Sequence, residues 1–68
     1  MSDELIVRLR EERAAHGWTQ AELAERIGVS RKTINTIENG VFVPSTVLAL
    51  KLAKAFGTSV EALFALSE

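Results

Sequence analysis

The sequence predicts an all-α fold in which five short helices surround one apolar core. Apolar residues recur every three or four positions in successive segments, which is the spacing that gives a helix one buried face. A serine, threonine or aspartate precedes each segment and can cap its first turn, and a glycine closes most of them. The 68 residues suffice for one small domain over 1–68, with no room for a second.

The first helix is expected to begin after Ser2 or Asp3, either of which can cap it, and to end near His16. One side of this helix would carry Leu5, Ile6, Leu9 and Arg13. An arginine on a buried side is costly unless it pairs with an acid or extends only its methylenes over the edge of the core. The pattern leaves both roles open for Arg13.

The centre of the chain predicts two helices joined by a tight turn. Thr19 and Glu22 form a capping box that starts the second helix. Gly28 can adopt positive φ and end this helix, and Ser30 can cap a third helix over 31–39. The inward faces carry Leu23, Ala24, Ile27, Ile34 and Ile37. Two helices joined by a short turn containing glycine match the helix-turn-helix motif.

Two further helices are predicted in the last third of the chain. Ser45 caps a fourth helix that ends at Phe56 before Gly57, and Thr58 or Ser59 caps a short fifth helix. The buried stripe of the fourth helix contains Leu48, Ala49, Leu52, Ala53 and Phe56, and that of the fifth contains Val60, Leu63 and Phe64.

Apolar residues outside these stripes predict a surface that is covered in the working protein. The loop Val41–Pro44 is apolar where loops are usually polar, and Val47 and Leu50 lie beside it. An apolar surface of this kind usually marks an interaction site. The alternative is that Phe42 folds back onto its own helices. The expected dimer interface comprises Phe42, Val43, Val47, Leu50 and Leu66.

The outward face of the third helix carries the functional signal. Side chains that form hydrogen bonds gather towards its N-terminal end, namely Arg31, Lys32, Thr33, Asn35 and Thr36. A helix fits the major groove of DNA, where arginine or lysine pairs with guanine, asparagine with adenine, and threonine with several base edges. The N-terminal ends of the second and third helices, at Gln20 and Ser30, favour nearby phosphate. The motif therefore predicts that this helix reads bases.

The chain resembles the Cro/repressor-type (XRE-type, lambda-repressor-like) helix-turn-helix proteins over nearly its whole length. The residues that carry the likeness are 19–24, 28–30, 34–40, 44–45 and 53–57. Val41 and Thr46 depart from the pattern, because family members often have a polar residue and a leucine at these positions. The resemblance implies a compact five-helix fold with the helix-turn-helix at helices two and three.

The resemblance also implies roles for individual residues in DNA binding. Gln20 and Asn39 would contact the phosphate backbone. Asn35 fits the base-reading face, although its use varies among family members. The bases would be read from the start of the third helix by Arg31, Lys32, Thr33 and Thr36.

An ion pair follows from the same resemblance. In the family, an arginine of the first helix pairs with the glutamate near the end of the third. The spacing to Gln20 suggests that Arg13 pairs with Glu38, with Arg10, one turn earlier, as the rival.

Composition narrows the classes of function. Cysteine is absent and histidine occurs once, so we expect no disulfide, metal site, cofactor or catalytic residue. No apolar run approaches the roughly 20 residues that span a bilayer, so a cytoplasmic protein without membrane contact is expected. The net charge of −1 does not favour DNA, but Arg31 and Lys32 form a local basic patch.

The sequence thus predicts a transcriptional regulator that binds double-stranded DNA. As a homodimer it would insert the third helix of each subunit into the major groove of an inverted-repeat operator. The alternative is an antitoxin or adaptor that presents its apolar surface to a different protein. Salt separates the two hypotheses, because binding to DNA weakens steeply as salt rises and apolar association does not.

Overall fold

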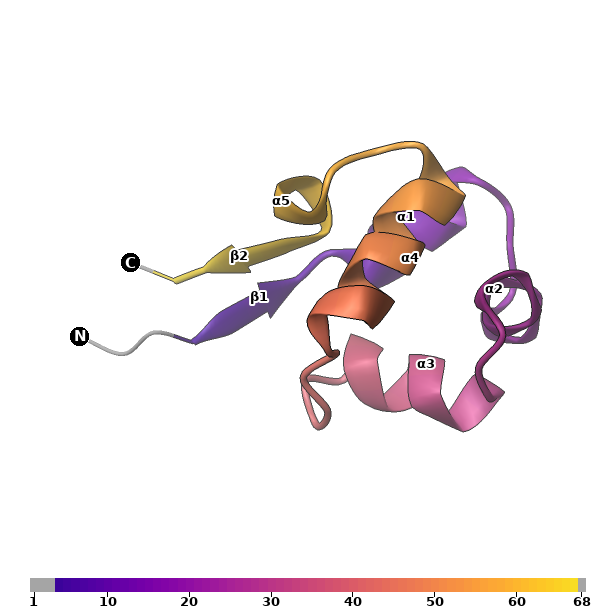
Figure 1. The fold of residues 1–68 in the computed structure, drawn as a ribbon, viewed down its shortest axis with the longest axis horizontal. Helices are drawn as coiled ribbons and strands as arrows, with labels where there is room; N and C mark the ends of the chain where they lie inside the picture. The colour runs from indigo at the N-terminus through magenta and orange to yellow at the C-terminus, as the bar shows by residue number, and fades with distance from the viewer. Residues whose placement is uncertain (1–3, 68) are drawn as a thin grey trace.

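The computed structural model describes residues 4–67, which form five helices and a two-stranded sheet. In chain order the elements are β1 (Leu5–Val7), α1 (Leu9–Ala15), α2 (Gln20–Ile27), α3 (Arg31–Glu38), α4 (Thr46–Phe56), α5 (Val60–Leu63) and β2 (Phe64–Leu66). Figure 1 shows helices α1 to α4 gathered at one end of the molecule, while the two strands extend away from them. The five-helix architecture is confirmed, and the strands are an addition to it.

The capping box at the start of α2 is present as predicted. The Thr19 hydroxyl accepts a hydrogen bond from the backbone N–H of Glu22 at 3.0 Å, and the Glu22 carboxylate accepts one from the backbone N–H of Thr19 at 2.8 Å. The second of these bonds is the main reason that the pKa of Glu22 lies below its ordinary value. Gly28 ends α2 at a φ of 74°, a backbone conformation that side chains rarely tolerate.

Serine caps the next three helices. The hydroxyls of Ser30, Ser45 and Ser59 accept hydrogen bonds at 3.1–3.2 Å from the backbone N–H three residues further on. Ser59, and not Thr58, is therefore the cap of the last helix. Helix α3 ends at Glu38, one residue earlier than predicted, and Asn39 is its C-cap.

The prediction for the first helix was wrong at its start. Residues 5–7 form strand β1, and α1 begins only at Leu9, with Arg8 as an N-cap that makes no side-chain capping bond. The predicted caps Ser2 and Asp3 lie outside the described residues. The physical reason is pairing with β2, in which Leu5 lies opposite Leu66 and Val7 opposite Phe64. Phe64, expected on the buried stripe of the last helix, belongs to β2 instead.

The strands form what we call the terminal ribbon, residues 5–7 and 64–66. It is an antiparallel pair, and further hydrogen bonds extend it at both ends: Arg8 N donates to Leu63 O and Ser67 N to Glu4 O, each at 2.8 Å. Three-residue strands are short, and a lone two-stranded pair is only marginally stable in water. The stability of the ribbon therefore depends on its attachment to the core through Val7 and Phe64.

The core lies between the helices and draws on every one of them. Its buried residues are Leu9, Leu23, Ala24, Ile27, Ile34, Ile37, Leu52, Ala53, Phe56 and Leu63. Trp18 covers one end of this core, where its ring stacks on Phe56 at a centroid distance of 5.3 Å. The guanidinium carbon of Arg26 lies over the Trp18 ring, 4.0 Å from the ring centroid. The helix-turn-helix is thus fixed to α4 by packing.

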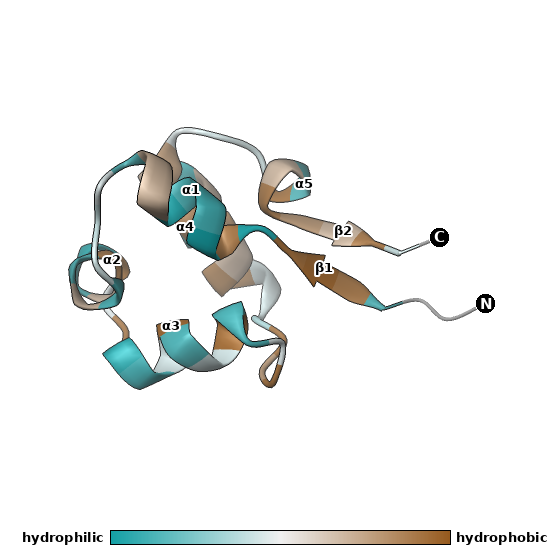
Figure 2. Ribbon diagram, turned by 180° about the vertical axis from the view of Figure 1, so that it is seen from behind, coloured by the Kyte–Doolittle hydropathy of each residue, from teal (hydrophilic) through white to brown (hydrophobic). Residues whose placement is uncertain are grey.

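Eight large apolar side chains remain exposed among the described residues, and they fall into two groups. The first group lies on the α3–α4 loop and α4 and comprises Val41, Phe42, Val43, Val47 and Leu50. The second lies on the terminal ribbon and comprises Leu5, Ile6 and Leu66. Figure 2 shows the loop between α3 and α4 and strand β1 as strongly hydrophobic. Among residues 4–67, no helix is long and apolar enough to cross a membrane.

Candidate nucleic-acid interface

Helix α3 presents its polar side to solvent. Arg31, Lys32 and Asn35 are exposed, whereas Thr33 and Thr36 are half-buried at the margin of this face. Within residues 4–67 the side chains of Arg31 and Lys32 make no hydrogen bond or ion pair. Two cations at the N-terminal end of an exposed helix are therefore available to an external acceptor.

The hydroxyls of the two threonines on this face form hydrogen bonds within the protein. The hydroxyls of Ser30 and Thr33 lie 2.9 Å apart, and the Thr36 hydroxyl donates to Thr33 O at 2.9 Å. Thr36 O in turn accepts from the backbone N–H groups of Val41 and Phe42. The start of the apolar loop is thereby fixed beside α3.

The sequence allows Phe42 either to be part of an exposed interaction surface or to fold back onto its own helices, and its position in the structure lies between these two roles. It lines a hollow of about 420 Å³ together with Thr36 and Leu48, so one side of its ring lies near α3 and α4. The residue nevertheless remains 45% exposed. Phe42 therefore contacts its own helices and still contributes to the apolar surface.

Side-chain amides connect α2 to α3. Gln20 Nε2 donates to Asn35 Oδ1 at 3.2 Å and to Glu38 Oε1 at 3.1 Å. Asn39 Nδ2 donates to the same Asn35 oxygen at 3.2 Å and to Asn35 O at 2.9 Å. The structure thus brings Gln20, Asn35 and Asn39 together on one side of the motif, with the amide donors of Gln20 and Asn39 turned towards the protein.

Glu38 is the centre of this polar network. Arg13 Nε lies 2.7 Å from Glu38 Oε2, and Arg13 Nη2 lies 3.2 Å from Oε1. The Glu38 side chain is fully shielded from solvent, at 0% exposure, and that of Arg13 is 17% exposed. Arg13 Nη1 also donates to Trp18 O at 2.9 Å. Arg13 therefore connects α1 to both ends of the helix-turn-helix.

The electrostatics of Glu38 reflect two opposing effects. Burial by itself would raise the pKa of the Glu38 carboxyl, but hydrogen bonds from Arg13 and Gln20 and the charge of Arg13 outweigh it, so the pKa lies below its ordinary value. The hydrogen bond to Glu38 likewise raises the pKa of Arg13. Both groups are consequently charged at neutral pH.

Arg10 joins this network, in addition to Arg13 and not in place of it. Its Nε lies 3.4 Å from Glu38 Oε1 and its Nη2 lies 3.3 Å from Asn39 Oδ1. Sequence reasoning treated Arg10 only as a rival partner for Glu38 and missed its contact with Asn39. The available signal was the spacing of Arg10 and Arg13, since residues three apart share one side of a helix.

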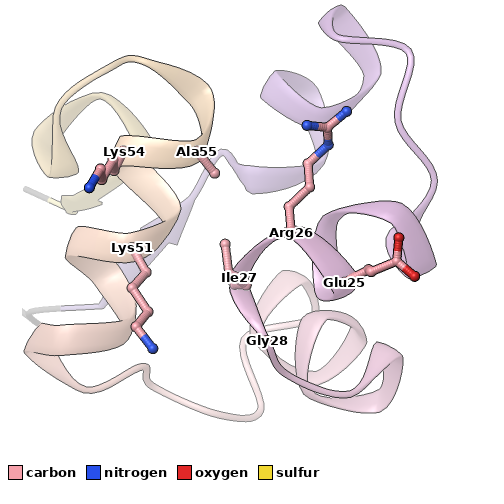
Figure 3. Close-up of a pocket in the computed structure, with 7 residues that line it drawn as sticks. All are labelled: Glu25, Arg26, Ile27, Gly28, Lys51, Lys54 and Ala55. Carbon is pink, nitrogen blue, oxygen red and sulfur yellow. The ribbon is translucent and has the colours of Figure 1, made fainter.

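Basic residues also line a groove of about 710 Å³ between α2 and α4. Figure 3 shows Arg26, Lys51 and Lys54 pointing in different directions, so their charges do not converge on one point. The described residues contain no cluster of acidic or histidine side chains that could hold a metal ion. The exposed side of α3 is therefore the candidate functional surface of the described chain.

A capped helix pair joined by a glycine turn, with an exposed polar second helix, defines a helix-turn-helix DNA-binding protein. The helix-turn-helix family model matches residues 9–63, and the chain belongs to that family of transcriptional regulators, which are not enzymes. The resemblance found in the sequence is confirmed.

Two relatives are similar over most of their length. The HTH-type transcriptional regulator YgzD of Bacillus subtilis, itself uncharacterised, is 46% identical over 61 residues, which cover 90% of this chain and 92% of the relative. An uncharacterised HTH-type transcriptional regulator of Methanocaldococcus jannaschii is 49% identical over 57 residues, covering 84% of this chain and 86% of the relative.

Solved structures show the same fold. The restriction-modification controller protein C.AhdI from Aeromonas hydrophila superposes with a TM-score of 0.75 at 39% identity, over 79% of this chain and 78% of the controller. The clp gene regulator ClgR from Corynebacterium glutamicum also gives a TM-score of 0.75, at 37% identity, over 79% of this chain and 57% of the regulator.

Proposed function

We propose that this regulator binds DNA in a sequence-specific manner, as a homodimer that recognises an inverted-repeat operator. The observation that carries the proposal is the exposed N-terminal end of α3, where Arg31 and Lys32 have no partner among residues 4–67. In a helix-turn-helix protein this end of the second helix enters the major groove. Arginine and lysine there bind guanine O6 and N7.

The proposed base-reading residues are those of the exposed face and its margin, namely Arg31, Lys32, Thr33, Asn35 and Thr36. The Asn35 carboxamide oxygen already accepts from Gln20 and Asn39, so its N–H groups are the part that a base would meet. Asparagine can then donate to purine N7. These residues would give the protein its sequence preference.

Gln20 and Ser30 are proposed to position the protein on the phosphate backbone, and Asn39 to act at the phosphate backbone through Arg10, whose Nη2 donates to Asn39 Oδ1. The Gln20 amide donates to two protein acceptors, so its contact would come chiefly from the backbone N–H at the first turn of α2. Ser30 marks the equivalent position before α3. Such contacts set register without selecting sequence.

The proposed dimer interface takes Phe42, Val43, Val47 and Leu50 from the first exposed group and Leu66 from the terminal ribbon. A domain of about 70 residues gains only roughly 3–5 kcal/mol from its own core, so burying further apolar surface against a second copy would stabilise it. Val43, Val47, Leu50 and Leu66 are each more than half exposed.

Replacing Leu50 with glutamate is expected to dissociate the dimer, because a carboxylate buried in an apolar interface loses its hydration. Sedimentation should show the mass fall from that of two chains to that of one. Lys51→Glu, on the neighbouring position but outside the apolar surface, is the matched control and should leave the mass unchanged. A dimeric Leu50→Glu variant would exclude Leu50 from the interface.

The same exposed apolar surface favours one alternative, an antitoxin or adaptor that binds a different protein. Affinity for DNA measured from about 50 to 200 mM salt separates the two, because release of counterions makes DNA binding fall steeply over this range. Affinity that is weak and independent of salt would favour the protein partner.

Selection of bound fragments from random DNA is the direct test of the proposed function. A homodimer with one α3 per half-site should recover an inverted repeat whose half-sites lie about 34–36 Å apart, roughly one turn of DNA. Recovery of fragments without a common sequence would reject sequence-specific recognition.

A further inference from the structure

The geometry points to Arg10 as a further DNA contact, whose guanidinium binds a backbone phosphate beside the C-terminal end of α3. This inference rests on the proposed function, because it assumes that α3 lies in the major groove. Arg10 belongs to α1, outside the helix-turn-helix, and its side chain is 59% exposed. It reaches α3 through Asn39, whose Oδ1 accepts from Arg10 Nη2 at 3.3 Å.

Counting donors favours Arg10 over Asn39 at this end of the helix. A phosphate oxygen accepts hydrogen bonds and donates none, so its protein partner must offer an N–H or O–H group. The Nδ2 group of Asn39 already donates to Asn35 O and Asn35 Oδ1. Its Oδ1 is occupied by Arg10. The Asn39 side chain therefore orients Arg10 and has no donor left to offer a phosphate.

Comparison with Arg13 shows why Arg10 has donors to spare. Arg13 engages Nε, Nη1 and Nη2 inside the protein and is largely buried. Arg10 engages only Nε and Nη2, at 3.4 and 3.3 Å, so Nη1 is uncommitted. A guanidinium offers several N–H groups in a fixed plane and binds phosphate well. Both arginines contact Glu38, but Arg13 stabilises the fold, whereas Arg10 keeps a guanidinium group exposed to solvent.

The position of Arg10 completes a pattern of charge along α3. Arg31 and Lys32 lie at the N-terminal end of the helix, and Arg10 lies beside its C-terminal residues Glu38 and Asn39. Phosphate contacts fix the register and angle of a protein on the duplex. Cations at both ends would hold α3 along the groove, with the base-reading face between them.

The test is the salt dependence of DNA binding by the full chain, measured on a selected operator and on a random duplex. Loss of one phosphate contact lowers the slope of log K against log salt by about 0.9 per bound subunit. Arg10→Gln should show this loss on both duplexes. Arg10→Lys should restore most of the slope, because an ammonium group still neutralises a phosphate.

Lys54→Gln is the matched control, since it removes one exposed cation from the groove between α2 and α4, seen in Figure 3. Its slope should equal that of the wild type. A wild-type slope in folded Arg10→Gln, or an Arg10→Lys slope as shallow as that of Arg10→Gln, would confine Arg10 to the Glu38 network and overturn the inference. Wild-type binding that does not respond to salt would reject the proposed function itself.

Discussion

Replacing Arg13 with methionine is expected to cost about 3–5 kcal/mol of folding free energy, which is the usual cost of removing one partner from a buried ion pair. The Glu38 carboxylate is fully shielded from solvent and would retain only the Gln20 amide and the longer contact from Arg10. Methionine keeps most of the aliphatic stem, so the loss reflects charge more than packing. Urea denaturation, monitored by circular dichroism, measures this loss of folding free energy.

The double variant Arg13→Met with Glu38→Gln is the control for this prediction. It should recover a large part of the lost stability, because no uncompensated carboxylate remains buried. A double variant that loses as much stability as the Arg13→Met and Glu38→Gln single variants added together would show that the pair is not coupled.

The acid side of the stability curve gives an independent measurement of the same pair. Because the folded pKa of Glu38 is lowered, its contribution is complete above the unfolded value of about 4.3 and is lost as pH falls through the folded value. The stability difference between wild type and Glu38→Gln should hold steady from about pH 7 to pH 5 and shrink below pH 4.

Replacing Arg31 with alanine is expected to weaken binding to the operator by about 1–3 kcal/mol, roughly 5- to 150-fold, and to relax the preference at one base pair. The physical reason is that a bidentate bond to guanine has no substitute in alanine, while the phosphate contacts remain. Arg31 makes no contact that the fold needs among residues 4–67, so thermal unfolding should not change.

Competition between operator and random duplex measures the Arg31 effect, with Lys54→Ala as a control cation away from α3. An equal loss on both duplexes would assign Arg31 to the phosphate backbone only. Lys54→Ala should leave the ratio of the two affinities unchanged.

Local rules predicted the parts of the fold that short-range chemistry decides. The capping box at Thr19, the cap at Ser30 and the turn at Gly28 each depend on residues within a few positions, and each is present in the structure. The inward faces of α2 and α3 followed from helical spacing and are buried. The exposed polar face of α3 follows from the same spacing.

The terminal ribbon could not be predicted in this way. Leu5, Ile6 and Val7 form an apolar run that is compatible with a helix or a strand, and three residues are too few for periodicity to separate the two. What decides the structure is the partner strand near the other end of the chain. The Arg10–Asn39 contact was missed for a similar reason, since it joins residues 29 apart.

The terminal ribbon should form after the helices during folding and open before them. Pairing Leu5 with Leu66 closes a loop that contains every helix, so chain entropy opposes that closure until the helices have condensed. The two strands should therefore pair late in folding and separate early in unfolding. Amide protons of residues 5–7 are expected to exchange with deuterated solvent well before those of α2 and α4, in openings that leave the DNA-facing helices intact.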